Sequence, residues 1–234
     1  MAEENIFNEV DEELRNERMR NLWRKYAPII FGLILLIVLS VAGKEAYTWW
    51  KNDVSAKSSD QFYVAIELAN DGNIDEAQKA LDIVVSEGSG DYAILAQFRS
   101  ASLLLEADKV KEAVAAYDAL ATSLSNPSLR DLALILAGFA LVDGGDVKEV
   151  EARVGGFLAP DNVLRNRAKE AIALTHYGAG DINEALGVFE QIMADPLASS
   201  QNNARVQIYV EQLIAQGAKS PAIKEEAQNE ASPQ

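Results

Sequence analysis

An internal repeat limits the possible folds of this chain more than any other feature of its sequence. Four segments share one form, in which a turn residue is followed by acidic residues and then by apolar residues at helical spacing. They are GNIDEAQKALDIV at 72–84, DKVKEAVAAYDAL at 108–120, GDVKEVEARVGGF at 145–157 and GDINEALGVFEQI at 180–192. Aligned on Ala77, Ala113, Val150 and Ala185, the segments recur after 36, 37 and 35 residues. Self-similarity at such a period is typical of a solenoid of stacked helix pairs.

Each segment predicts the second helix of a pair, and a small residue lies twelve positions before each alignment residue. These small residues are Ala65, Ala101, Gly138 and Ala173. A small side chain on the first helix allows the second helix to approach closely. Four positions after the alignment residues come Leu81, Tyr117, Val154 and Phe189, which we expect to fill the space between pairs. The sequence therefore predicts helix pairs at 58–87, 92–123, 128–158 and 163–195, and a capping helix at 199–216.

The segment Ala27–Gly43 (APIIFGLILLIVLSVAG) has seventeen residues without a charge, which is long enough to cross a bilayer. Tryptophan and tyrosine residues at both ends suit the two membrane interfaces. Five basic residues lie just before the segment and three just after it, so the N-terminus is expected in the cytoplasm. The large domain then lies outside, which in a bacterium is the periplasm. A buried core helix is one alternative, and a signal peptide cleaved after Ser40-Val41-Ala42 is the other, although its n-region would be long and acidic.

These features divide the chain into five parts. Residues 1–26 form a cytoplasmic N-terminal helix, 27–46 the transmembrane helix, 47–57 a linker, 58–217 the repeat domain and 218–234 a disordered tail. The N-terminal helix either extends the membrane helix or docks a cytoplasmic partner. The predicted fold class is all-α: one transmembrane helix, then an α-solenoid of about four helix pairs and a capping helix.

The composition argues against several functions. The chain carries 21 basic and 36 acidic residues, a net charge of −15, which disfavours nucleic-acid binding. It has no cysteine and a single histidine, His176, which occupies an apolar position of the repeat and is expected to pack in a core or interface. No arrangement of a nucleophile with a base, no phosphate loop and no metal-binding spacing is present. We expect no enzyme activity, no cofactor and no metal.

In each repeat, a small residue is followed twelve positions later by alanine or, once, by valine, and four positions after that by a large apolar residue. This spacing resembles the tetratricopeptide pattern. The match is degenerate: the period exceeds the usual one, Val150 replaces an alanine, and Gly155-Gly156 interrupts a second helix.

The N-terminal stretch EVDEELRNERMRNLWRKYAPIIFG, followed by one membrane helix and such repeats, resembles the single-pass ancillary subunits of the bacterial Sec translocon (SecYEG), in particular the alphaproteobacterial members. The resemblance implies an inner-membrane protein whose periplasmic repeats bind translocon subunits and a membrane-anchored prolyl-isomerase chaperone, and that assists exported, still unfolded proteins. A periplasmic scaffold for envelope assembly or cell division, which uses the same fold, is the alternative.

In a tetratricopeptide-like stack the first helices line a groove. The repeat register places mainly apolar residues there, three before, one after and four after each small residue. The predicted protein-binding groove consists of Phe62, Ile66, Phe98, Leu105, Ile135, Phe139, Val142, Leu174 and Tyr177. Either a partner segment binds there by helix-in-groove burial, or the capping helix and the turn of the stack fill the groove.

Overall fold

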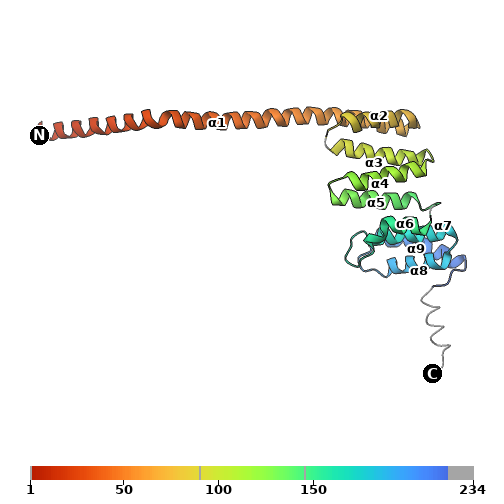
Figure 1. The fold of residues 1–234 in the computed structure, drawn as a ribbon. Coiled ribbons are helices and arrows are strands. Elements are labelled where there is room, and N and C mark those ends of the chain that lie inside the picture. Colours follow the sequence, from red (N-terminus) through yellow and green to blue (C-terminus); the bar gives the residue numbers. More distant parts are fainter. Residues whose placement is uncertain (1, 90, 145, 221–234) are drawn as a thin grey trace, which may run out of the picture. The chain divides into compact units, whose positions relative to one another are not determined.

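The computed structural model of the chain describes residues 2–89, 91–144 and 146–220. In this part of the chain the structure is helical and contains no strand (Figure 1). The fold class predicted from the sequence is confirmed. The tail predicted at 218–234 lies, from residue 221 onward, outside the described residues.

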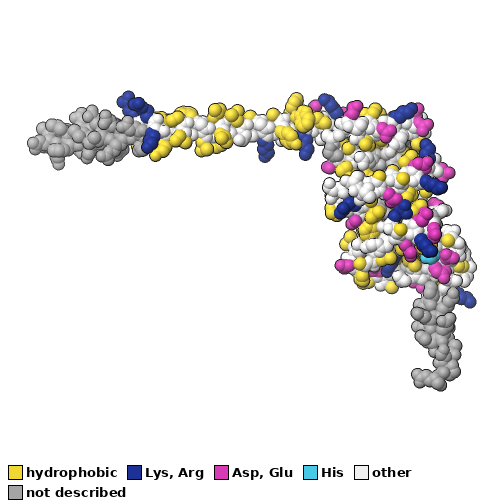
Figure 2. Space-filling model, viewed as in Figure 1, with side chains coloured by type: hydrophobic (Ala, Val, Ile, Leu, Met, Phe, Trp, Pro, Cys, Tyr) yellow, Lys and Arg dark blue, Asp and Glu magenta, His cyan; other side chains and the backbone are white. Residues whose placement is uncertain are grey.

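The first helix, α1 (Ala2–Asn70), is 69 residues long and unbroken. Its apolar stretch includes an 18-residue window with a mean hydropathy of 2.4, and no part of that window is buried. Figure 2 shows the apolar side chains along this stretch. The helix continues through Pro28. Such a helix is long and apolar enough to cross a membrane and is compatible with a single-pass anchor.

The chain divides after Lys57 into two units, and the last part of α1 belongs to the second. The residues predicted as a linker, 47–57, are helical. From Ser58 onward α1 has buried residues, and it ends at Asn70 as the first helix of the first pair.

The second unit is built of successive antiparallel helices. The pairs are the end of α1 with α2 (Ile74–Glu87), α3 (Asp91–Glu106) with α4 (Val110–Ser123), α5 (Pro127–Ala140) with α6 (Val147–Val154), and α7 (Arg165–Ala179) with α8 (Ile182–Met193). The short helix η1 (Gly155–Phe157) prolongs α6, and α9 (Ser200–Ala215) follows the last pair. The predicted pairs and the predicted capping helix match these bounds within a few residues.

The turn residue of the repeat has a conformational reason. Gly72, Asp108 and Gly180 occupy the same repeat position, and all three have a positive φ, of 81°, 59° and 87°. This left-handed backbone ends the first helix and reverses the chain within three residues, and it favours glycine or a short polar residue.

The small residues mark the closest approach within each pair. Ala65, Ala101 and Ala173 are fully buried, and Gly138 is buried as well. A Cβ atom added to Gly138 would lie 2.6 Å from Cγ1 of Val154 on the facing helix. The contact leaves no room for a methyl group unless Val154 shifts, so glycine fits this position best.

The apolar core runs along the stack as a series of four clusters. In chain order they are centred on Leu81, Tyr117, Val154 and Phe189, which are the four large residues that the repeat singles out. Each is at most 3% exposed. Each cluster draws its residues from neighbouring helices only, which is how a solenoid is stabilised.

Helix α9 takes the place of the first helix of a fifth pair. Gln212 Nε2 donates to the hydroxyl of Tyr177, 35 residues earlier and on the first helix of the fourth pair. Gly217, which follows α9, has a φ of 91°, as the turn residues after the earlier first helices do. The repeat therefore continues for half a unit beyond the fourth pair.

A buried ion pair links the start of α7 to the end of α8, the two helices of the fourth helix pair. The Nε and Nη2 atoms of Arg165, at the start of α7, lie 2.5 Å from the two carboxylate oxygens of Asp195, just after α8. Both side chains are under 10% exposed. The hydrogen bonds from Arg165, together with that from the backbone of Leu197, hold the pKa of Asp195 well below its usual range. The same pairing raises the pKa of Arg165.

We expect Gly138→Ala to destabilise the repeat unit by about 1–3 kcal/mol, because the added methyl group overpacks the contact with Val154. Helix propensity alone predicts the opposite sign, a gain of about 1 kcal/mol. The matched control is Gly156→Ala, where an added Cβ meets nothing within 4 Å. Urea unfolding of both variants measures the difference, and equal midpoints would show that the close approach does not limit the size of residue 138.

The Arg165–Asp195 pair should make stability depend on pH in the acid range. A carboxylate whose pKa is lowered in the folded state stabilises the fold above its unfolded pKa of about 4, and this contribution is lost as the pH falls below that value. In urea unfolding, the difference in stability between the wild type and Asp195→Asn should be constant above about pH 5 and shrink below about pH 4. Asp143→Asn, which removes an exposed carboxylate, controls for the loss of one negative charge. A difference that does not change with pH would contradict the proposed role of this pair.

Candidate protein-binding surface

Eight of the nine residues predicted for the groove lie on the first helices of the four pairs, and Val142 lies in the turn just after α5; we call this set the first-helix row. Ile135 is 5% exposed, and the other eight residues are half-buried. The row is therefore neither a solvated wall nor a closed core. Its side chains keep part of their surface available.

The row does not form one cluster but contributes to each of the four in turn. Phe62 packs on the first cluster, Phe98 and Leu105 on the second, and Leu174 and Tyr177 on the last. In the third cluster, Ile135 is part of the core and Phe139 and Val142 pack against it. Ile66 belongs to none of the four. Eight of the nine residues are thus anchored in the core of the stack.

Aromatic contacts hold the rings of the row. Phe62 lies 6.1 Å from Tyr92 and Phe98 lies 6.3 Å from Tyr117, measured between ring centroids. The guanidinium carbon of Arg167 lies 5.3 Å from the ring centroid of Phe139, within cation–π range. The orientations of the rings are therefore fixed by neighbours, which lowers the entropy cost of binding against them.

The row becomes polar at its C-terminal end. Glu170, at the position equivalent to Phe62, Phe98 and Ile135, is only 2% exposed. Arg205 of α9 donates to both of its oxygens, from Nε at 2.6 Å and from Nη2 at 2.8 Å. These hydrogen bonds raise the pKa of the Arg205 guanidinium. Arg167 donates to Glu170 as well, at 2.9 Å.

Helix α9 covers the last members of the row. Gln212 and Gln216 donate to the hydroxyl of Tyr177, and the ring of Tyr209 meets that of Tyr177 edge-on at 6.3 Å. At the fourth pair the capping helix therefore lies against the row. The first helix of the next pair lies against the earlier parts of the row as well: Tyr92 of α3 meets Phe62, and Arg167 of α7 lies over Phe139.

Two polar networks were not foreseen from the sequence: the pair Arg165–Asp195, and the group of Glu170 with Arg167 and Arg205. The spacing of charged residues in the sequence could have predicted one of these networks. Arg205 follows Glu170 by 35 residues, the period of the repeat, and Arg153 follows Asp118 by the same distance and forms a similar two-pronged ion pair. Opposite charges one period apart thus indicate contacts between successive repeats.

The single histidine has a structural setting. His176 lies in the last turn of α7, its side chain is 20% exposed, and its Nδ1 lies 3.4 Å from Asp181.

Within the residues that the structure describes, no group of three or more histidine, aspartate or glutamate side chains is placed to hold a metal ion. Figure 2 shows acidic and basic side chains interspersed over the visible face of the repeat unit.

Comparison with known proteins agrees with this architecture. Residues 20–145 match the family described as tetratricopeptide repeat-like domain, and these residues make up more than half of the chain. No curated protein and no solved structure matches the chain. Proteins of this repeat type are generally scaffolds without enzymatic activity. The matched region includes the apolar part of α1 and the first two helix pairs, and the same repeat continues to α9. The chain belongs to the tetratricopeptide repeat-like domain family.

Proposed function

We propose that this chain is a membrane-anchored scaffold that binds proteins at the Sec translocon and assists the transfer of exported proteins to a chaperone. The observation that carries the proposal is the first-helix row, in which eight of nine apolar or aromatic side chains remain half-exposed on a tetratricopeptide-like stack. The apolar helix α1 leads directly into that stack. Translocon subunits and a membrane-anchored periplasmic prolyl-isomerase chaperone are the proposed partners.

The row suits a peptide ligand on physical grounds. A groove between stacked helices can bury the apolar face of a helix or of an extended segment, and alternating pockets then select side chains. Segments that leave a translocation channel are unfolded and rich in exposed apolar residues. The chain is strongly acidic, with a net charge of −15, which favours solubility while part of the row is uncovered.

The proposed location is the bacterial inner membrane, with the N-terminus in the cytoplasm and the repeats in the periplasm. The excess of basic residues before the apolar stretch supports this orientation. A pull-down from detergent-solubilised membranes tests the partner. The proposal expects translocon subunits to dominate, whereas envelope-assembly or division proteins would favour the alternative scaffold.

The orientation predicts the behaviour of a reporter fused after Gln234. Alkaline phosphatase, which folds only where disulfides form, should be active, and a cytoplasmic reporter at the same place should be inactive. N-terminal sequencing of the same fusion should find the intact N-terminus. A mature N-terminus at Gly43 would show a cleaved signal peptide, and cytoplasmic activity would reverse the orientation.

The first-helix row predicts that Phe98→Glu and Phe139→Glu weaken the capture of partners several-fold, because each places a charge where an apolar segment is buried. The matched control is Ile83→Glu, at an apolar residue of α2 that is 45% exposed and lies outside the row. Circular dichroism checks that the variants remain folded. A photo-crosslinker at position 98 or 139 in living cells gives a second readout, and its failure to capture any translocon or chaperone subunit would place binding elsewhere.

A further inference from the structure

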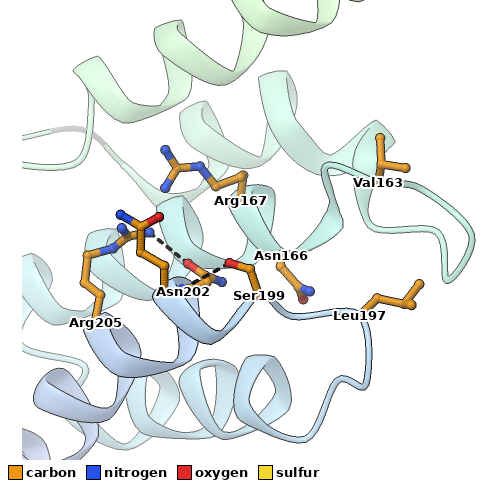
Figure 3. A pocket seen from close by; sticks show the side chains of 8 residues that line it. Val163, Asn166, Arg167, Leu197, Ser199, Asn202 and Arg205 are labelled. Atoms are coloured by element: carbon orange, nitrogen blue, oxygen red, sulfur yellow. Dashed lines mark hydrogen bonds between the residues drawn. The ribbon is translucent and has the colours of Figure 1, made fainter.

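A pocket lies between the N-terminal parts of α7 and α9 (Figure 3), and one of its residues, Arg167, contacts Phe139 of the first-helix row. It has a volume of about 330 Å³. Its walls come from three places: α7, the start of α9, and the two loops that precede these helices. The lining residues are Val163, Asn166, Arg167, Leu197, Ser199, Gln201, Asn202 and Arg205.

The charged residues that line the pocket are both arginines. Arg167 and Arg205 share one carboxylate, Glu170, and both donate to the same oxygen of it, so the two guanidinium groups lie side by side. The two guanidinium charges thus share one buried carboxylate. In a chain with a net charge of −15, this is a local excess of positive charge.

Both arginines retain hydrogen-bond donors. Arg205 uses Nε and Nη2 for Glu170 and Asn202, and within the described residues its Nη1 has no acceptor. Arg167 uses only Nη1, for Glu170. Their side chains are 40% and 50% exposed, so the remaining donors are accessible. Paired guanidinium forks of this kind match the geometry of an oxyanion, and a carboxylate is the usual one in proteins.

The rim of the pocket is apolar. Val163 is 91% exposed and Leu197 is 71% exposed, which are among the highest values for large apolar side chains in the described part of the chain. Figure 3 shows both side chains on the loops beside the polar wall. A free inorganic anion gains nothing from these two residues, whereas an aliphatic side chain beside a carboxylate covers them.

The pocket wall also holds a buried acceptor. Asn166 is 9% exposed, and its Oδ1 has no hydrogen-bond donor within the described residues. The pocket adjoins the first-helix row, since Arg167 lies over the ring of Phe139.

From this arrangement we propose that the pocket binds an acidic residue of a partner peptide, with an aliphatic neighbour packed on Val163 and Leu197. The carboxylate pairs with Arg167 and Arg205 at the polar end of the row. This contact fixes the direction and the register of the segment that lies along the row. The inference rests on the proposed function as a protein-binding scaffold, and it adds the chemistry that the partner must carry.

A random library of displayed dodecapeptides, selected on the full-length chain in lipid nanodiscs, tests the proposal. We expect peptides with aspartate or glutamate beside an aliphatic residue to be enriched several-fold over empty nanodiscs. The enrichment should fall to background for Arg167→Gln and for Gln201→Glu. The second variant adds a repelling carboxylate in the first turn of α9, where a negative charge favours the helix, so the fold is preserved. Gln191→Glu, an exposed position outside the pocket with the same change in charge, is the matched control and should behave as wild type.

The strongest selected peptide then serves as the probe for a direct measurement. Replacing its acidic residue by the matching amide should weaken binding to the wild type about tenfold, but should have little effect on Arg167→Gln. Val163→Ser combined with Leu197→Ser should weaken the peptide with the aliphatic neighbour and leave its serine analogue unchanged.

The outcomes separate this inference from the proposed function. Selected peptides without acidic enrichment, or with enrichment unchanged in both pocket variants, overturn the pocket inference and leave the scaffold proposal standing. Displacement of the peptide by millimolar acetate or inorganic phosphate to the same extent as by the unlabelled peptide would show a simple ion site, and would overturn the inference too. If no peptide is enriched, the inference fails, while the scaffold proposal depends on the pull-down from membranes.

Discussion

The close approach of two helices within each pair is the contact on which the rest of the repeat unit depends. It needs a residue without bulk on the first helix, and the chain supplies Ala65, Ala101, Gly138 and Ala173, all of which are buried. Once the two helices touch at this point, the large residue of the second helix is directed into the space between pairs. The four core clusters follow from that geometry. A solenoid built in this way has no single central core, so each pair relies on its neighbours for burial.

Much of this packing could be predicted from the sequence, because the same pattern of small and large residues occurs in all four repeats. The period gave the number of helix pairs, and the small and large positions identified buried residues, from Ala65 to Phe189. Even the left-handed turns were marked by Gly72 and Gly180. Agreement between several independent signals at one spacing makes such an interpretation robust, since a single degenerate position such as Val150 does not alter the others.

What could not be predicted depends on side chains that meet across loops. Arg165 and Asp195 are 30 residues apart, which is not the period of the repeat, and the turns at either end of the fourth pair bring them together. The exposure of the first-helix row also could not be read from its pattern, because apolar residues at one register position serve a core and a groove equally well. Its use as a binding surface remains a proposal, and the half-buried state of Phe98 or Phe139 is compatible with it.

The half-unit formed by α9 makes the two ends of the stack unlike each other. At the N-terminal end, the first helix is a continuation of the apolar helix α1, so its backbone hydrogen bonds run on without an end to fray. At the other end, α9 packs into the last core cluster through Val206 and Leu213, both fully buried, and Arg205 adds an ion pair with the buried carboxylate of Glu170. Apolar packing changes little with ionic strength, and salt screens a buried ion pair much less than a surface pair. Both ends of the stack are thus insensitive to ionic conditions, one because its helix is uninterrupted and the other because its contacts are buried.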